Sequence, residues 1–356
     1  MVGIRPVREH PVTGAPPGAA RVAAIDCGTN SLRLLIADAD PRQAALADLV
    51  RRMEIVRLGQ GVDATGRLTP EALARTFGVL AEYAKIITEY SATAVRMVAT
   101  SATRDAANAD EFVRGVTGIL GVPPEVLSGS QEASLSFTGA TAELARPGAG
   151  GPRLAPPYLV VDIGGGSTEF VLGGDQAGGT GRDGKAVAGS PGESAAGALA
   201  AVSVDIGCVR LTERHLHSDP PAEAEVAAAA ADIDMAIDLA VAEVPVRRAR
   251  TFVGLAGSVT TVAGIALGLP AYDAGRIHHA RITAAQVHAV TRMLLGRTRA
   301  ERGLIAVMHP GRVDVIGAGA LVLDRIIARL GFAEVVASEH DILDGIAWSL
   351  AGCRDR

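Results

Sequence analysis

An apolar run, an acid, three glycines, two hydroxyl residues and a second acid follow one another in VVDIGGGSTEF, at residues 160–170. The first apolar run ends at Asp162, and the second begins after Glu169. If the two runs pair as a hairpin, the two carboxylates meet at the mouth of the turn. The glycines at 164–166 can adopt positive φ and direct backbone N–H groups onto an anion, and Ser167 adds a hydroxyl donor. The pattern therefore predicts a phosphate cradle flanked by acids.

The acids beside this cradle imply a cation, because carboxylates would repel a phosphate bound next to them. Mg²⁺ prefers one or two carboxylates together with waters and phosphate oxygens. Asp162 and Glu169 are therefore the expected metal ligands, with Mn²⁺ as an alternative ion. An ordinary tight hairpin with solvent-facing acids is the alternative for a glycine triplet taken alone.

A second copy of this pattern lies near the N-terminus. The sequence AAIDCGTNSLRLLI, at 23–36, aligns with LVVDIGGGSTEFVL, at 159–172, and the alignment pairs Asp26 with Asp162. Both copies consist of an apolar strand, an Asp-x-Gly sequence, a turn with hydroxyl groups and a returning apolar strand. One copy in each half of the chain indicates two duplicated domains that face each other across a cleft.

Length, charge and cysteine content narrow the class of protein. The chain has 356 residues, which is enough for two domains with separate cores. Its formal net charge of −5 offers no basic field to nucleic acid. Cys27, Cys208 and Cys353 are scattered and odd in number, so they predict free thiols in a reducing cytosol, with neither a disulfide framework nor a zinc site.

Two segments bear on where the protein lies in the cell. Residues 1–20 lack the apolar core of a signal peptide, and their Pro, Gly and Ala content predicts a disordered leader. Residues 251–272 carry no charge, but glycines and hydroxyl residues dilute their hydropathy. A buried strand followed by a helix is therefore favoured there over a membrane span. We expect a cytoplasmic protein that does not enter the membrane.

Strands and helices alternate along the chain, which is typical of an α/β fold. Expected strands lie within 21–37, 95–100, 158–173, 201–207 and 334–337, and expected helices at 71–90, 132–144, 222–243 and from about 341. The Pro/Gly-rich segment 146–157 predicts a boundary between a first domain at 21–145 and a second at 146–356. Within the second we expect a flexible insertion at 173–200 and a C-terminal helix that packs back on the first domain.

Eight stretches of this sequence, in order, resemble the exopolyphosphatase / guanosine pentaphosphate phosphatase family of the actin–sugar kinase–heat-shock ATPase superfamily. They are IDCGTNSLRLLIAD, VATSATRDAAN, SGSQEASLSFTGA, VVDIGGGSTEFVLG, VDIGCVRLTE, GLAGSVTTV, DVIGAGALVLD and SEHDILDGI, and they are spread over about residues 21–350. The resemblance implies an α/β fold of two actin-like (ribonuclease H-like) domains with the active site in the cleft between them.

The resemblance also implies a reaction, the Mg²⁺-dependent hydrolysis of a terminal phosphoanhydride with release of orthophosphate. In SGSQEAS the family's catalytic glutamate falls on Glu132, which would act as general base on the attacking water. Asp162 and Glu169 match the acids that hold the metal and position the water. The residues that match the family's phosphate contacts are Asn30, Ser31, Arg33, Arg104, Gly164, Gly165, Gly166 and Ser167.

The family comparison also bears on the substrate. Long members continue into helical domains that help to bind long polyphosphate, and this sequence stops after the second domain. Short polyphosphate chains or guanosine pentaphosphate are therefore the expected substrates. Gln131 and Asp344 depart from residues that are common in the family. Family members often dimerise, so a homodimer is an expected assembly.

Two other classes of function stay open. An actin-fold kinase for a small metabolite would share the phosphate turns but would need an acceptor site, and the position of Glu132 favours water as the acceptor. A sensor that binds polyphosphate or an alarmone without turnover would not need the intact acids Glu132, Asp162 and Glu169.

Overall fold

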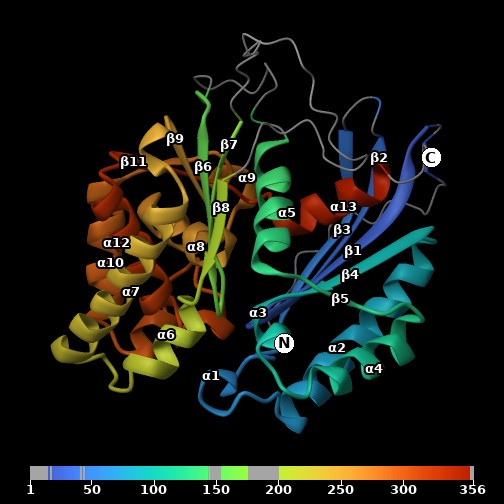
Figure 1. Cartoon of the computed structure of the whole chain (residues 1–356), viewed down its shortest axis with the longest axis horizontal. Coiled ribbons are helices and arrows are strands. Elements are labelled where there is room, and N and C mark those ends of the chain that lie inside the picture. Colours follow the sequence, from blue (N-terminus) through green and yellow to red (C-terminus); the bar gives the residue numbers. More distant parts are fainter. Residues whose placement is uncertain are drawn as a thin grey trace.

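The computed structural model describes residues 15–16, 18–40, 42, 45–142, 144, 154–174 and 200–352. Two α/β lobes lie side by side, and each is built around one sheet (Figure 1). Helices α5 (Gly129–Thr141) and α13 (Ile342–Gly352) lie at the junction of the lobes. The predicted class, α/β with two domains, is confirmed.

The first lobe contains a five-stranded sheet in the order β3-β2-β1-β4-β5. Strands β1, β2 and β3 are antiparallel, whereas β4 and β5 run parallel to β1. The strands are β1 (Ala20–Cys27), β2 (Ser31–Asp40), β3 (Ala45–Ile55), β4 (Ala94–Ala99) and β5 (Glu125–Val126). The helices are α1 (Val62–Thr65), α2 (Pro70–Glu89), α3 (Ser101–Arg104) and α4 (Ala109–Leu120).

The second lobe contains a six-stranded sheet in the order β10-β11-β9-β6-β7-β8. Its strands are β6 (Tyr158–Ile163), β7 (Thr168–Gly173), β8 (Ala200–Val204), β9 (Thr251–Leu255), β10 (Arg281–Thr283) and β11 (Glu334–Ala337). Its helices are α6 (Cys208–His215), α7 (Glu223–Glu243), α8 (Ala256–Ala266), α9 (Ala274–Ile277), α10 (Ala284–Leu295), α11 (Arg299–Gly303) and α12 (Ile316–Leu330), with 3₁₀ turns at Val246–Arg248 and Pro310–Arg312.

Strand β1 is buried on both faces, which explains its almost unbroken apolar sequence. Ala23 and Ile25 point into the core shared with α2 and α4. Val22 and Ala24, the alternate residues, point to the opposite face, which α13 covers. The C-terminal helix therefore completes the core of the first lobe although it follows a strand of the second.

The two copies of the sequence motif form equivalent hairpins. Asp26 lies opposite Arg33 in the β1–β2 pair, and Asp162 lies opposite Glu169 in the β6–β7 pair. In each lobe the first strand of the hairpin also pairs in parallel with a later strand, β4 or β9. The predicted hairpin and the predicted internal duplication are both confirmed.

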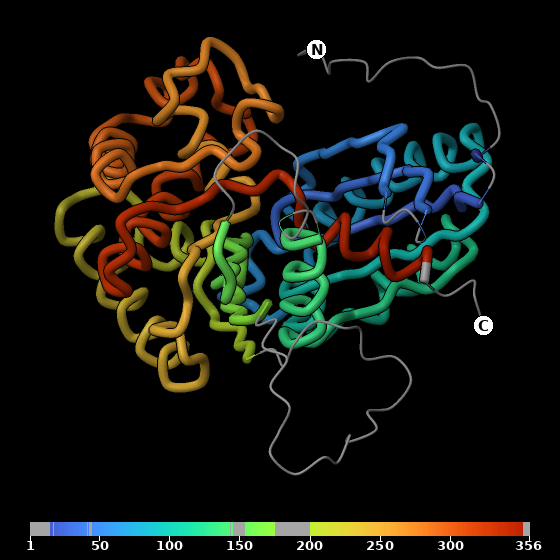
Figure 2. Tube along the Cα trace, turned by 90° about the horizontal axis from the view of Figure 1, so that it is seen from above, coloured from blue at the N-terminus to red at the C-terminus, as the bar shows by residue number. Residues whose placement is uncertain are grey.

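Helices α5 and α13 cross in backbone contact. A Cβ atom on Gly139 would collide with the carbonyl oxygen of Asp341, and one on Gly345 with the carbonyl oxygen of Leu135. Helix α13 leaves the second lobe and packs on β1 and β2, as its path in Figure 2 shows. Helix α5 in turn packs Phe137 against the second sheet. Packing therefore crosses the sequence boundary predicted at 145/146 in both directions.

Two predicted segments lie largely outside the described residues, namely the leader at 1–20 and the insertion at 173–200. The uncharged segment 251–272 forms β9 and then α8, as predicted. Within the ranges that the structure describes, no helix is both long and apolar enough to cross a membrane.

Candidate active site

A cavity lies where the two hairpin turns face each other between the lobes. The predicted site residues in its wall are Asn30, Ser31, Arg33, Glu132, Asp162, Gly164, Gly165 and Ser167. They come from both copies of the motif and from α5. Arg104, Gly166 and Glu169 lie just behind this wall, and each contacts a group next to the cavity. The structure therefore gathers the predicted residues around one site.

Equivalent hydrogen bonds close the two turns. The N–H of Gly28 donates to the carbonyl of Ser31, and the N–H of Gly164 donates to the carbonyl of Ser167, both at 3.0 Å. Each turn is thus held in a fixed shape before a ligand arrives, which suits a phosphate-binding loop.

The turns also approach each other closely. A Cβ atom on Gly166 would lie 2.7 Å from Oγ of Ser101 and 2.8 Å from Oγ1 of Thr29. Ser101 and Thr29 share a hydrogen bond of 2.8 Å. Glycine at 166 is therefore required for the contact between the lobes, apart from any role in binding phosphate.

Asp162 and Glu169 are buried cross-strand neighbours at the mouth of the second turn. The hydroxyl of Ser136 donates to Oδ2 of Asp162 and that of Ser203 donates to Oε1 of Glu169, each at 2.7 Å. Burial, reinforced by the charge of Glu169, raises the pKa of Asp162 to about 8. Burial also raises the pKa of Glu169 to about 7. When both acids are ionised, their two buried negative charges lie close together and favour a bound cation.

Glu132 is fixed by the way in which α5 begins. Ser128 caps the helix, because its Oγ accepts from the N–H of Gln131, and Oε1 of Gln131 accepts from the N–H of Ser128. Gln131, the departure from the family noted above, therefore has a structural role one residue before Glu132. This cap sets the direction of the first helical turn, from which Glu132 reaches the cavity.

Arg104 lies against Glu132. Its Nη1 donates to Oε2 of Glu132 at 3.2 Å and to the carbonyl of Leu127 at 3.0 Å. Burial raises the pKa of Glu132, the charge of Glu169 raises it further, and Arg104 acts in the opposite direction. The guanidinium is thus placed to favour the ionised form of this carboxylate.

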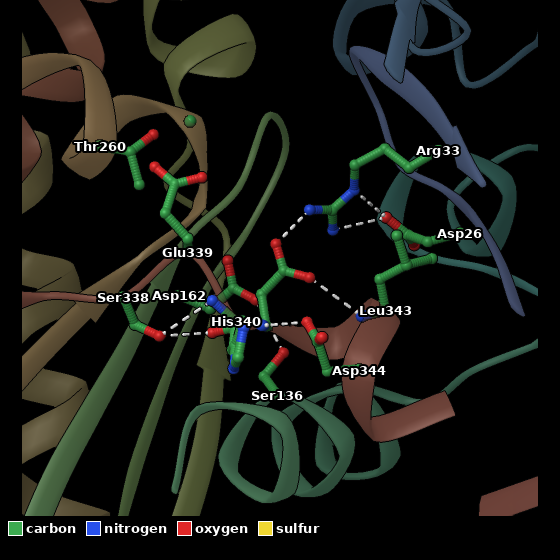
Figure 3. Close-up of polar contacts among 12 residues, drawn as sticks. Asp26, Arg33, Ser136, Asp162, Thr260, Ser338, Glu339, His340, Leu343 and Asp344 are labelled. Atoms are coloured by element: carbon green, nitrogen blue, oxygen red, sulfur yellow. Dashed lines mark hydrogen bonds and ion pairs between the residues drawn. The ribbon is translucent and has the colours of Figure 1, made fainter. Parts of the chain in front are cut away.

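Arg33 is held between two carboxylates. It donates to Oδ2 of Asp26 from Nε at 3.0 Å and from Nη2 at 2.8 Å (Figure 3), and its Nη1 pairs with Asp341. Asp341 follows β11 of the second lobe, so this pair connects the lobes. Arg51, which is partly exposed, and the buried Asp344 form a neighbouring ion pair at 2.5 Å. Asp344 therefore has an arginine partner, which explains how an acid is tolerated there.

Arg312 is a site residue that the sequence analysis missed. Its guanidinium lines the cavity and donates from Nη1 to the carbonyl of Gly257 at 3.0 Å and to Oγ1 of Thr261 at 3.2 Å. Within the described part of the chain it forms no ion pair, and burial lowers its pKa. It occupies the space that a side chain at 257 would fill. No local sequence pattern marks it, because it follows a Pro-Gly turn far from both motifs.

The residues present fit a divalent metal such as Mg²⁺. Oδ1 of Asp26, Oδ1 of Asn30 and Oε2 of Glu169 are buried without a hydrogen-bond partner within the described ranges. These atoms are all oxygen donors, which hard cations prefer. Among the described residues, no group of three or more Asp, Glu, His or Cys could hold a metal. The chain would therefore supply one or two carboxylates, and water and phosphate the remaining ligands.

A second cavity of about 370 Å³ adjoins the first and shares Arg33 and Arg312 with it. Its wall combines apolar residues, among them Met53, Val307 and Met308, with the arginines Arg33, Arg51, Arg52 and Arg312. At its polar side the hydroxyl of Tyr272 donates to Oε1 of Glu339 at 2.6 Å.

Comparison with known proteins gives one consistent result. Residues 35–352 match the model of the Ppx/GppA phosphatase family. Exopolyphosphatase 2 of Mycobacterium tuberculosis (strain ATCC 25618 / H37Rv) is 48% identical over 343 residues, which cover 93% of this chain and 99% of that protein. A bifunctional 3-dehydroquinate synthase/phosphatase of Fusobacterium nucleatum is 30% identical, covering 91% of this chain and 45% of that protein.

Solved structures show the same fold. An exopolyphosphatase-like protein matches with a TM-score of 0.84 and 42% identity, over 94% of this chain and 98% of that one. The Ppx/GppA family member of Aquifex aeolicus matches with a TM-score of 0.70 and 28% identity, over 95% and 99%. These matches confirm the actin-like two-domain architecture.

Proposed function

Because the chain belongs to the Ppx/GppA phosphatase family, we propose that it hydrolyses the terminal phosphoanhydride of inorganic polyphosphate, favouring short chains, and releases orthophosphate. The position of Glu132 carries this proposal. Its carboxylate lines the cavity between the two phosphate turns and has Arg104 beside it at 3.2 Å. A base at this place can act on a water that faces a phosphate held by both turns.

The chain's own groups would perform three tasks. Backbone N–H groups of the turns and the hydroxyls of Ser31 and Ser167 would bind the oxygens of the terminal phosphate. Glu132 would orient the attacking water and accept its proton at a carboxylate oxygen. Arg104 would keep Glu132 ionised until that transfer. Phosphoryl transfer depends mainly on positioning and charge neutralisation, which this arrangement supplies.

We propose Mg²⁺ as the cofactor, held by Asp162 and Glu169, with Mn²⁺ as an alternative. When bound, the metal would neutralise charge on the phosphate oxygens. Ser136 and Ser203 fix the orientation of the two carboxylates by the hydrogen bonds described above. Arg312, whose charge has no carboxylate partner in the described part of the chain, would bind a further phosphate at the border of the second cavity.

Orthophosphate release by the purified protein with Mg²⁺ tests the proposal. Short polyphosphate, long polyphosphate, guanosine pentaphosphate and ATP are compared, with Glu132→Ala as the control. We expect release from short polyphosphate that the variant abolishes. No release from any substrate, with binding retained, would contradict hydrolysis and support a sensor. Phosphate transfer to a small metabolite would instead support a kinase.

Guanosine pentaphosphate is the second candidate substrate, and the second cavity favours it. Much of the wall is apolar, which suits a nucleoside, and the arginines that line it can bind the phosphates attached to that nucleoside. The nucleotide should then have a higher kcat/KM than inorganic tripolyphosphate. Equal values would show that the second cavity contributes no binding energy to the reaction.

A further inference from the structure

Arg210 contacts the glycine turn at residues 164–167. Helix α6 donates three backbone N–H groups to this turn: Cys208 to the carbonyl of Gly164 at 3.0 Å, and Val209 and Arg210 to that of Gly165 at 2.9 and 3.1 Å. The side chain of Arg210 adds the next bond, because its Nε donates to the carbonyl of Gly166 at 2.7 Å.

These hydrogen bonds determine the direction of the backbone N–H groups in the turn. A peptide unit is planar, and its N–H is directed opposite to its C=O. When the carbonyls at 164–166 point toward α6 and Arg210, the N–H groups that follow them are directed the other way. Gly165 and Ser167 of this turn line the cavity. The last of these peptide units is held by a side chain, that of Arg210, and not by the helix backbone.

The far end of the same side chain is bound to the other lobe. Nη1 of Arg210 donates to Oδ1 of Asp63, and Nη2 donates to Oδ2 of Asp105, both at 2.6 Å. Asp63 belongs to α1, and Asp105 follows α3, so both acids lie in the first lobe. Asp105 in turn neighbours Arg104, with 3.9 Å between its Oδ1 and Nε of Arg104.

We infer that Arg210 is a positioning residue that couples closure of the two lobes to the shape of the glycine turn. With the lobes together, Asp63 and Asp105 fix the guanidinium, and the guanidinium fixes the carbonyl of Gly166. With the lobes apart, the guanidinium keeps only the more distant Asp205 of its own lobe, 3.8 Å from Nη2, and the peptide that follows Gly166 can rotate. The phosphate cradle is therefore complete only in the closed arrangement. This role rests on the hydrolysis proposed above.

A matched control lies one helical turn away. Arg214 binds the same Asp63, from Nε at 3.2 Å and Nη2 at 3.0 Å, and also binds Asp232 at 2.8 Å. No hydrogen bond joins it to the glycine turn in the described part of the chain. Arg214→Gln thus removes an ion pair between the lobes and leaves the glycine turn untouched. Arg210→Gln removes ion pairs between the lobes and also the hydrogen bond to the carbonyl of Gly166.

Two measurements on the full-length protein test the inference. In the first, kcat and KM for phosphate release are measured for Arg210→Gln, Arg210→Lys, Arg214→Gln and Asp105→Asn. We expect Arg210→Gln to lower kcat about 100-fold, because a small misplacement of the reacting groups has an effect of that size. Arg210→Lys should not restore it, because an ammonium cannot reach three partners in a plane. Arg214→Gln should keep kcat within about threefold of the wild type, the effect of a surface ion pair.

The double variant Arg210→Gln/Asp105→Asn should be no slower than Arg210→Gln alone, since the two residues act through one connection. Additive losses, or equal losses for Arg210→Gln and Arg214→Gln, would overturn the inference.

The second measurement is amide hydrogen exchange of the peptide that contains residues 164–167, without substrate. Exchange should be faster in Arg210→Gln than in the wild type and unchanged in Arg214→Gln. Unchanged exchange in Arg210→Gln would overturn the inference. If the wild-type protein releases no phosphate, the proposed function fails, and the exchange result still decides whether Arg210 holds the turn.

Discussion

Nη1 of Arg104 lies 3.2 Å from Oε2 of Glu132, and the two side chains come from different helices, α3 and α5. The arginine matches a phosphate contact of the family, but its visible partner here is the expected base. A residue that binds the base can control the protonation of that base as well as the charge of the site.

Replacing Glu132 by Gln should lower kcat by about 10²–10⁴-fold, the usual contribution of a general base. The amide keeps the shape of the side chain, so KM should change little. Phosphate release under saturating substrate measures the effect. An unchanged kcat would mean that Glu132 does not accept the proton.

Arg104→Met should shift the acidic limb of the pH–rate profile to higher pH, because the charge of Arg104 lowers the pKa of Glu132. The profile of kcat/KM against pH for wild type and variant provides the measurement. Arg96→Met is a suitable control, because Arg96 binds Glu125 at the edge of the sheet, away from the cavity. Identical profiles for Arg104→Met and wild type would contradict this coupling.

The metal-free protein should lose stability as the pH rises. Burial raises the pKa of Asp162 to about 8 and that of Glu169 to about 7, above unfolded values of about 4. The folded state therefore retains protons that the unfolded state has lost, and the free energy of unfolding falls as the pH rises from about 4 through about 8.

Thermal unfolding at several pH values checks this prediction. Mg²⁺ should raise Tm more at pH 8 than at pH 5, because it competes with protons for the same carboxylates. In Asp162→Asn, both Tm and the increase in Tm caused by Mg²⁺ should depend less on pH. A Tm that rises with pH over this range would argue against the coupled carboxylates.

Asp162→Asn should abolish phosphate release and leave the fold intact. The amide oxygen can still accept the hydrogen bond from Ser136, and the substitution removes a carboxylate whose ionisation is unfavourable there. Specific activity and Tm are measured on the same preparation. Loss of the fold with activity retained in the folded fraction would support an ordinary structural hairpin.

Gly166→Ala should separate the two turns, because its Cβ would lie 2.7 Å from Oγ of Ser101. We expect a loss of about 1–3 kcal/mol of stability from overpacking and a fall in kcat. Gly78→Ala, in an open position on α2, should instead stabilise the protein by about 1 kcal/mol without changing kcat. Urea unfolding and phosphate release distinguish the two variants. Full activity in Gly166→Ala would show that the turns need not touch.

The hairpin register could be predicted from sequence because it is local. Asp162 and Glu169 are seven positions apart on two apolar runs, so pairing of the runs places them opposite each other. The helix that presents Glu132 was also predicted, at 132–144, and in the structure it begins three residues earlier, at Gly129. The role of Gln131 was not recognised, although Ser128 followed three residues later by Gln131 is the pattern of a capping box.

Contacts between distant parts of the chain could not be predicted in the same way. Arg33 and Asp341 are 308 positions apart, and Arg210 and Asp105 are 105 apart. Each of these contacts depends on how the lobes are placed relative to each other, and no local pattern of apolar and polar residues carries that information.

The crossing of α5 and α13 has a consequence for how such proteins diverge. At Gly139 and Gly345 the joint is made of main chain against main chain, so its geometry does not depend on the size of surrounding side chains. Each lobe can exchange its apolar residues for others without disturbing the joint. The family member of Aquifex aeolicus, at 28% identity, matches this fold over 99% of its own length. The contact between the helices therefore constrains Gly139 and Gly345 more tightly than the residues around them.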